Sequence, residues 1–175
     1  VYSVQEIKSI ADFVHSRGML LHMDGARIAN AAVSLDLPFK AFTTDAGVDV
    51  LSFGGTKNGM MFGEAICFLK PGLSKDFKYI RKQGMQLASK MRFISAQYIA
   101  YFRNDLWKKS ASHSNAMAGI MADKLQQIPE IMVTQPVQSN GIFVIMHSEV
   151  AERMSNRYFF YPWNEKISEY RLMTS

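Results

Sequence analysis

An acid, an arginine and a lysine follow two apolar runs in the first third of the chain. Residues 21–27 read LHMDGAR and end in Asp24 and Arg27, and residues 50–59 read VLSFGGTKNG and end in Lys57. Such runs are typical of strands that are buried on both faces and carry functional groups at their carboxyl ends. A carboxylate, a guanidinium and an isolated lysine at adjacent strand ends predict a pocket for an anionic ligand with a reactive carbonyl.

Lys57 is the candidate nucleophile. A surface loop lysine is the ordinary alternative, but Lys57 follows SFGGT at a strand end, where the loops of α/β sheets build their sites. A lysine amine shielded from water has a lowered pKa and forms a Schiff base with a carbonyl. Thr56 and the amides of Gly54 and Gly55 offer hydrogen bonds to a phosphate. A nucleotide-binding P-loop is excluded, because its glycine spacing is missing and Asn58 follows the lysine.

Asp24 needs a partner, because a carboxylate buried alone after large apolar residues costs too much free energy. That partner is either Arg27, in a local ion pair, or the protonated ring nitrogen of a pyridoxal cofactor. His22 shares a strand face with Asp24, since alternate side chains point the same way. It either orients Asp24 or is a hydrogen-bonded core histidine, and the core histidine is the favoured interpretation. Arg27 also suits a ligand carboxylate, which a guanidinium binds in bidentate fashion.

A second arginine, Arg171, lies in the apolar run EYRLMTS at residues 169–175. Arginine is rarely buried without an anion, so Arg171 pairs either with a structural partner such as Glu169 or with a ligand carboxylate. The sequence leaves both possibilities open. His113 and His147 lack metal-ligand spacing, and no metal site is expected.

Composition narrows the class of protein. The 175 residues carry a net charge of +5, with 48% hydrophobic and 20% charged residues, as in ordinary globular proteins. Basic residues cluster only between Lys75 and Arg92, so nucleic-acid binding is not expected. The single cysteine, Cys67, excludes a disulfide framework within the chain and fits a reducing cytoplasm. No apolar run approaches the roughly 18 residues of a membrane span.

The elements that would position these groups follow an α/β order and then an α+β order. Residues 19–23, 48–53 and 65–69 predict strands. A helix with Ile7, Ile10, Ala11 and Val14 on one face is expected before them, with a further helix at 27–35 and a helical turn at 39–43. The sheet is expected to be mainly parallel, although the third strand could be antiparallel, because residues 54–63 are too few for a crossover helix. Later, helices are predicted at 75–83, 91–102, 106–127 and 149–155, and strands at 132–133, 142–146 and 167–173, with a helix break near Asn104 and Asp105.

Two motifs, HMDGAR at 22–27 and SFGGTKNG at 52–59, resemble the low-specificity L-threonine aldolases. These are pyridoxal 5'-phosphate enzymes of the aspartate-aminotransferase fold type I, in the beta-eliminating lyase and threonine aldolase family. The resemblance extends over nearly the whole chain through KQGMQ at 82–86, SKMRF at 89–93, QSNGIF at 138–143 and YRLMTS at 170–175. It implies that residues 1–100 form the second half of the cofactor-binding large domain. Residues 101–175 would form a small α+β C-terminal domain without its final helix.

The resemblance also implies roles for the candidate residues. Lys57 would bind pyridoxal phosphate covalently, Asp24 would keep the ring nitrogen protonated, and Thr56 would lie near the phosphate. Arg27, near the cofactor, and Arg171 would bind the carboxylate of a small amino-acid substrate. The implied reaction cleaves L-threonine or L-allo-threonine into glycine and an aldehyde, in a homodimer or homotetramer.

Three further expectations accompany that reaction. The chain begins at Val1 rather than at a methionine, so a longer parent protein is expected, with the base for the β-hydroxyl in its N-terminal half. The 175 residues alone are therefore expected to be inactive. The alternatives are another enzyme of this fold type, either a β-eliminating lyase or an aminotransferase, and a non-catalytic scaffold.

Overall fold

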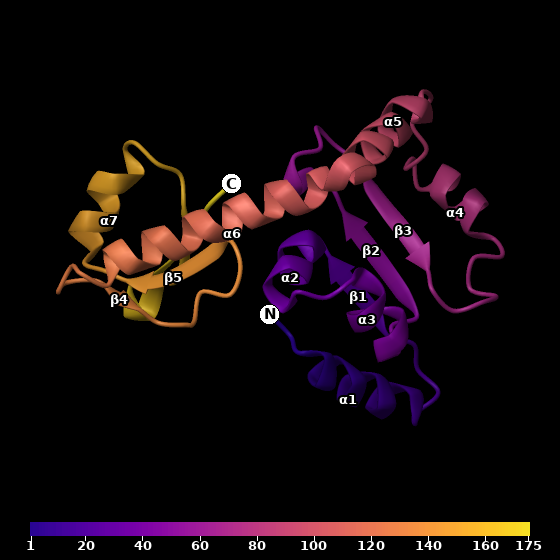
Figure 1. The fold of residues 1–175 in the computed structure, drawn as a ribbon, viewed down its shortest axis with the longest axis horizontal. Coiled ribbons are helices and arrows are strands. Elements are labelled where there is room, and N and C mark those ends of the chain that lie inside the picture. Colours follow the sequence, from indigo (N-terminus) through magenta and orange to yellow (C-terminus); the bar gives the residue numbers. More distant parts are fainter. The chain divides into compact units, whose positions relative to one another are not determined.

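The computed structural model describes residues 1–175 and divides them into two units, Val1–Lys108 and Lys109–Ser175 (Figure 1). The sequence places a domain boundary between residues 100 and 101. The assignment of the two parts to a large and a small domain stays a prediction. None of the helices is long and apolar enough to cross a membrane.

Unit 1 is built on a three-stranded sheet with the order β1-β2-β3. β1 (His22–Gly25) pairs in parallel with β2 (Val50–Gly54), and β3 (Glu64–Phe68) pairs antiparallel with β2. The antiparallel third strand that the short connection allows is therefore confirmed. β1 lies at the edge of this sheet. Its register with β2 places Asp24 opposite Ser52, so the carboxyl ends of the two parallel strands lie side by side at the same end of the sheet.

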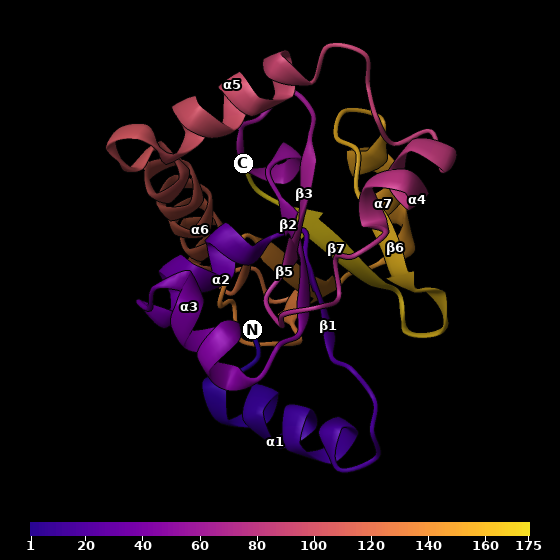
Figure 2. The same ribbon diagram turned by 90° about the vertical axis from the view of Figure 1, so that its right-hand side faces the viewer.

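Helices cover one face of this sheet. α1 (Val4–His15) begins with a capping box, in which Ser3 accepts a hydrogen bond from the Glu6 amide and Glu6 accepts one from the Ser3 amide. α2 (Ile28–Leu35) and α3 (Phe39–Phe42) follow, and they lie along one side of the sheet (Figure 2). Ile28, Phe42 and Phe53 are buried in the core between these layers.

The other face of the sheet is largely open, with Phe77 packed against Phe68 at one end of β3. His22 and Asp24 are exposed on β1, and Ile66 on β3 keeps 40% of its surface accessible. The expectation that these strands are buried on both faces is wrong for this chain. Their apolar composition reports mainly the helix-covered face, while the open face mixes the polar side chains of β1 with apolar ones such as Val50, Ile66 and Phe68.

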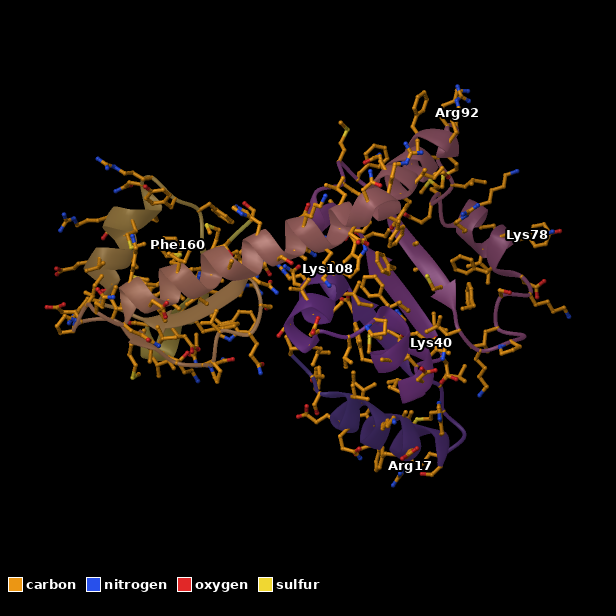
Figure 3. All side chains as sticks on the ribbon, in the orientation of Figure 1. Arg17, Lys40, Lys78, Arg92, Lys108 and Phe160 are labelled. Carbon is orange, nitrogen blue, oxygen red and sulfur yellow. The ribbon has the colours of Figure 1, made fainter.

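Two further helices complete unit 1, and a third begins there and runs into unit 2. α4 (Phe77–Gln83) and α5 (Met91–Phe102) precede α6 (Leu106–Leu125). Asn104 and Asp105 have φ angles of 52° and 55°, so a left-handed backbone separates α5 from α6 and confirms the predicted break. The basic side chains of this region are surface groups, as Lys78 on α4 and Arg92 on α5 illustrate (Figure 3). Short single-turn helices at Thr44–Ala46, Thr56–Asn58, Arg103–Asp105 and Glu165–Ile167 complete the set.

Unit 2 is an antiparallel sheet with the order β4-β5-β7-β6. Its strands are β4 (Met132–Val133), β5 (Gly141–Ile145), β6 (Tyr161–Asn164) and β7 (Glu169–Met173). Ile142, Val144 and Leu172 form a core with Ala118 of α6 and Ala151 of α7 (Ser148–Ser155). β6 is absent from the sequence prediction, because Pro162 argues against a strand and is tolerated here only at a sheet edge.

Candidate functional site

The segment that carries Asp24 and the segment that carries Lys57 contact each other at glycine residues. A Cβ added to Gly54 would lie 2.6 Å from Cα of Ala26, and one added to Gly25 would lie 2.7 Å from the carbonyl oxygen of Ser52. Real side chains do not approach backbone this closely, so only glycine permits the contact. The ends of β1 and β2 are therefore held in backbone contact, and the residues that follow them leave the sheet side by side.

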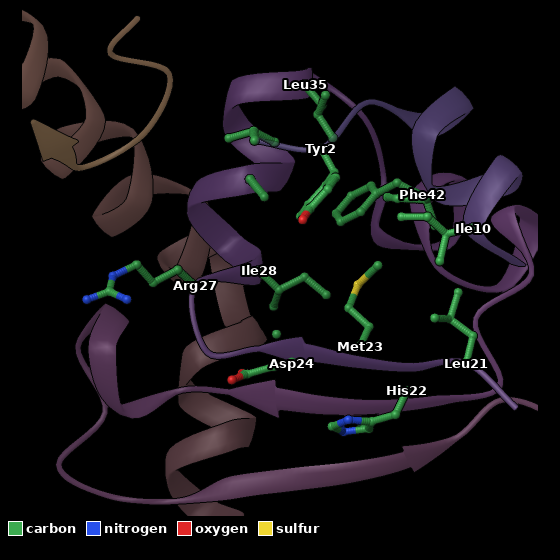
Figure 4. Close-up of a pocket in the computed structure, with 14 residues that line it drawn as sticks. Tyr2, Ile10, Leu21, His22, Met23, Asp24, Arg27, Ile28, Leu35 and Phe42 are labelled. Carbon is green, nitrogen blue, oxygen red and sulfur yellow. The ribbon is translucent and has the colours of Figure 1, made fainter. Parts of the chain in front are cut away.

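Asp24 presents its carboxylate on the open face at the end of β1 (Figure 4). Its Oδ1 accepts a hydrogen bond of 2.9 Å from the Ala26 amide, the short-range bond with which aspartate stabilises a turn. Asp24 forms no salt bridge with Arg27, so the interpretation as a local ion pair is wrong. The carboxylate is oriented by a backbone amide and faces solvent.

His22 lies on the same open face as Asp24. Its Nε2 is 2.9 Å from the hydroxyl oxygen of Ser52, across the parallel β1–β2 pair. The ring is exposed, which overturns the favoured interpretation as a core histidine. The ring is exposed because no helix covers this part of the sheet. The apolar sequence neighbours Leu21 and Met23 give no sign of this exposure.

Lys57 occupies the single-turn helix Thr56–Asn58 that follows β2, and Gly59, with a φ of 102°, ends this turn. The side chain is exposed, so the residues of this chain do not shield the amine from water as expected. Thr56 is exposed as well, and its hydroxyl donates a long hydrogen bond of 3.4 Å to the carbonyl of Gly63. Both side chains are accessible to a ligand.

Asn58, beside the lysine, is the anchor of this turn and was not among the predicted site residues. It is 5% exposed, and its Nδ2 donates hydrogen bonds of 2.6 Å to Tyr101 Oη and 2.9 Å to the Trp107 carbonyl. Burial raises the pKa of Tyr101, and the bond from Asn58 partly opposes this rise. The local sequence shows only a turn-forming asparagine before Gly59, and it carries no signal of these distant partners.

Tyr98 forms hydrogen bonds at both ends of the loop that carries Lys57. Its hydroxyl donates to the carbonyls of Phe53, at 3.1 Å, and Gly63, at 3.3 Å. Burial, assisted by the Glu64 carboxylate, raises the pKa of Tyr98 to about 12. The phenol therefore stays protonated at neutral pH and remains a hydrogen-bond donor to both ends of residues 53–63.

An apolar cavity of about 440 Å³ lies beside β1. It is bounded by α1, α2, α3 and β1 and is lined by Val1, Tyr2, Ile7, Ile10, Leu21, His22, Met23, Asp24, Gly25, Arg27, Ile28, Ala31, Leu35 and Phe42. Asp24 and Arg27 lie at one end of it, away from the apolar side chains at the other end (Figure 4). The Asp24 side chain leaves β1 on the opposite side from Met23, so its carboxylate points to the open face and away from the apolar part of the cavity (Figure 4).

Arg171 lies in unit 2 on β7, whereas Asp24, Arg27, Thr56 and Lys57 belong to unit 1. Glu169 is not its partner, because Glu169 accepts a hydrogen bond of 2.6 Å from Thr134 and forms no salt bridge. The interpretation that Arg171 pairs with Glu169 as a structural partner is therefore wrong. Its role toward a ligand stays a prediction.

Comparison with known proteins identifies relatives over most of the chain. The beta-eliminating lyase family matches residues 1–149. The chain is 42% identical over 157 residues to a low specificity L-threonine aldolase of Pseudomonas sp. (strain NCIMB 10558), and 41% identical to one of Pseudomonas aeruginosa. A threonine aldolase structure from Leishmania major matches 99% of the chain with a TM-score of 0.87 and 30% identity.

These matches cover only part of the relatives. The aligned residues are 90% of this chain but 45% of each Pseudomonas protein, and the Leishmania match covers 52% of that structure. The chain therefore spans about half the length of the proteins that it resembles. It contains one portion of their fold.

Proposed function

The chain belongs to the beta-eliminating lyase family, and on this premise we propose that the protein containing it is a pyridoxal 5'-phosphate-dependent aldolase. It would cleave β-hydroxy-α-amino acids such as L-threonine and L-allo-threonine into glycine and an aldehyde. The observation that carries this proposal is the arrangement of Asp24 and Lys57 at the carboxyl ends of the parallel strands β1 and β2. Relatives at 41–42% identity named low specificity L-threonine aldolase support the substrate class.

The residues present fit this cofactor. Asp24 is an exposed carboxylate whose one hydrogen bond, from the Ala26 amide, fixes its direction without neutralising its charge. A protonated ring nitrogen needs such an acid. Lys57 is exposed at the end of the neighbouring strand, on a turn secured by Asn58, and it can reach a carbonyl carbon. These features supply one wall of a site.

When bound, pyridoxal phosphate withdraws electrons from the bonds at Cα of an attached amino acid, which is the chemistry that the reaction requires. Asp24 would hold a proton on the ring nitrogen, and Lys57 would bind the carbonyl carbon of the cofactor covalently. The Thr56 hydroxyl would donate to the phosphate. Arg27 and Arg171 would each offer a planar pair of N–H donors to the substrate carboxylate.

The chain leaves one part of the reaction to other residues. We assign the base for the β-hydroxyl to none of its side chains and propose that a residue of the longer parent protein supplies it. We also propose assembly into a homodimer or homotetramer. A monomeric holoenzyme in light scattering would contradict this assembly.

The test uses the full-length protein reconstituted with pyridoxal phosphate. We expect glycine and acetaldehyde from L-threonine, and borohydride reduction is expected to attach the cofactor to the peptide containing Lys57. Lys57→Ala should lose both label and activity, whereas Lys78→Ala, at an exposed lysine of α4, should retain both. No label at Lys57 would overturn every pyridoxal proposal, and keto-acid formation in place of glycine would indicate an aminotransferase.

A further inference from the structure

The unit 2 sheet carries a row of aromatic side chains around Arg171. The strand register sets Phe143 of β5 and Tyr161 of β6 directly opposite Arg171 of β7, one on each side. Directly opposed residues share a face of an antiparallel sheet, so these three side chains form one row across it. The neighbouring residues Ile142, Val144 and Leu172 point to the other face, where they pack in the core with α6 and α7.

A β-bulge brings a further ring to this row. Tyr161 and Pro162 pair with Arg171 and Tyr170, but Asn164 pairs with Glu169, which leaves Trp163 as the extra residue. Bulges bend a strand locally and re-aim a side chain, and they are frequent next to active sites. The Trp163 ring reaches past β7 and meets Phe143 edge to face, with a centroid separation of 5.1 Å.

The guanidinium of Arg171 is held by rings and not by an acid. Its Cζ lies 4.9 Å from the centroid of the Trp163 ring and 5.2 Å from that of Tyr161, both within the range of a cation–π contact. Its Nε is buried without a hydrogen-bond partner, and it forms no salt bridge. The positive charge is therefore fixed in place but not neutralised, which leaves it available to an anionic ligand.

We propose that Tyr161 and Trp163 are positioning residues that hold Arg171 ready for the carboxylate of the amino-acid substrate. This inference rests on the proposed function and adds two residues to it. A free arginine side chain loses rotamer freedom when it binds an anion, and a pre-fixed guanidinium avoids part of that loss. The aromatic faces favour the cation without competing for its N–H donors, as a carboxylate partner would. The site is thereby selective for ligands with a free α-carboxylate.

The test compares variants of the full-length enzyme loaded with pyridoxal phosphate. Trp163→Leu and Tyr161→Leu remove a π face but keep apolar bulk. We expect each to raise KM for L-threonine, and the inhibition constant of glycine, by about threefold to tenfold, the range of a single cation–π contact. The value of kcat should change less than about twofold, and Trp163→Phe should restore most of the affinity. Tyr158→Leu, at an aromatic residue that is 65% exposed, is the matched control and should change nothing.

Two further measurements separate positioning from a general structural effect. An inhibitor without the carboxylate, 2-amino-1,3-butanediol, should bind Trp163→Leu and wild type equally. In an Arg171→Ala background, Trp163→Leu should add less than about a twofold change, because its effect acts through the arginine. The proposal would be overturned if Trp163→Leu lost as much affinity for the carboxylate-free inhibitor as for the substrate. It would also be overturned if Trp163→Leu caused its full loss of substrate affinity in the Arg171→Ala background.

The failure of this inference is distinguishable from failure of the proposed function. A wild-type enzyme that cleaves L-threonine, combined with an unchanged KM in both leucine variants, would refute positioning alone. A wild-type enzyme that gives no glycine would refute the aldolase. If Trp163→Leu does not fold by circular dichroism, Tyr161→Leu and Trp163→Phe decide the outcome by the same criteria.

Discussion

The side-chain amide of Asn58 donates a hydrogen bond of 2.6 Å to the hydroxyl of Tyr101, which lies 43 positions later in the chain. The same nitrogen donates to the Trp107 carbonyl in the first turn of α6. Asn58 is thereby the link between the turn that carries Lys57 and the helices that follow. The placement of Lys57 depends on a buried amide and not on the lysine itself.

Asn58→Asp should strongly destabilise this region. The change replaces a two-bond donor by a carboxylate that faces the Trp107 carbonyl oxygen, and it buries a charge without a cation. We expect the free energy of unfolding to fall by about 3 kcal/mol in chemical denaturation of the full-length protein. Tyr101→Phe removes only one acceptor and should cost about 1 kcal/mol. An equal effect of the two variants would contradict the proposed anchoring by both bonds.

Asp24→Asn should lower the rate of the reaction without releasing the cofactor. The amide has nearly the shape of the carboxylate but cannot hold a proton on a ring nitrogen, so kcat should fall by about 100-fold or more while the cofactor remains bound. Steady-state kinetics with L-threonine and the absorbance of the bound cofactor measure the two effects. Asp36→Asn, at the C-terminal end of α2, is the matched control. An unchanged kcat in Asp24→Asn would refute the proposed role of Asp24.

Gly54→Ala should separate the two strand ends. The added methyl would lie 2.6 Å from backbone of Ala26, so the contact between the segments must open. We expect a loss of about 3 kcal/mol in the free energy of unfolding, the scale of overpacking, together with loss of activity. Gly119→Ala meets nothing within 4 Å and lies inside α6, so it should stabilise by about 0.5–1 kcal/mol. A tolerated Gly54→Ala would show that the segments are not held this closely.

Local patterns predict much of the fold but not the long-range relationships of the site. The helix at residues 91–102 and the break at Asn104 are predicted correctly, because periodicity and turn chemistry are local signals. The first strand is predicted at 19–23 but lies at His22–Gly25, because pairing with Val50 decides where the ladder begins. The open face at His22 and the partners of Asn58 depend on residues distant in sequence, and the bulge at Trp163 depends on the register between β6 and β7.

Asp49 should give unit 1 an acid-sensitive contribution to stability. Its carboxylate accepts hydrogen bonds of 2.7 Å from both the Leu21 amide and the His15 ring. Burial acts to raise the pKa of Asp49, but these bonds and the charges of His15 and Lys70 outweigh it, and the pKa lies below its usual 3.8. The folded state therefore binds fewer protons than the unfolded state, so this contribution is present above the unfolded pKa and is lost as pH falls through the folded one.

Asp49→Asn is the variant that measures this effect. It should lower the free energy of unfolding by about 2 kcal/mol near pH 6, and the difference from wild type should shrink below about pH 4. Urea denaturation at several pH values provides the measurement. Asp45→Asn, at a more exposed carboxylate that pairs with Lys40, should show only a small difference. A difference between wild type and Asp49→Asn that grows toward low pH would refute the assignment.

Cys67 should react slowly with thiol reagents. The residue lies on β3, and burial raises the pKa of its thiol above the usual 9.0, so little thiolate is present at neutral pH. Peptide mapping after iodoacetamide treatment at pH 7.5 should find Cys67 largely unmodified in the folded protein and fully modified after unfolding. Rapid labelling of the native protein would show that the thiol is accessible and ionised.

β1, the edge strand that carries Asp24, has a practical consequence for laboratory production of these residues. Its outer side has no strand partner within the 175 residues, and apolar side chains such as Met23 line the cavity beside it. An unprotected edge is a template for intermolecular strand addition. Expression of this stretch alone should therefore yield inclusion bodies or soluble aggregates.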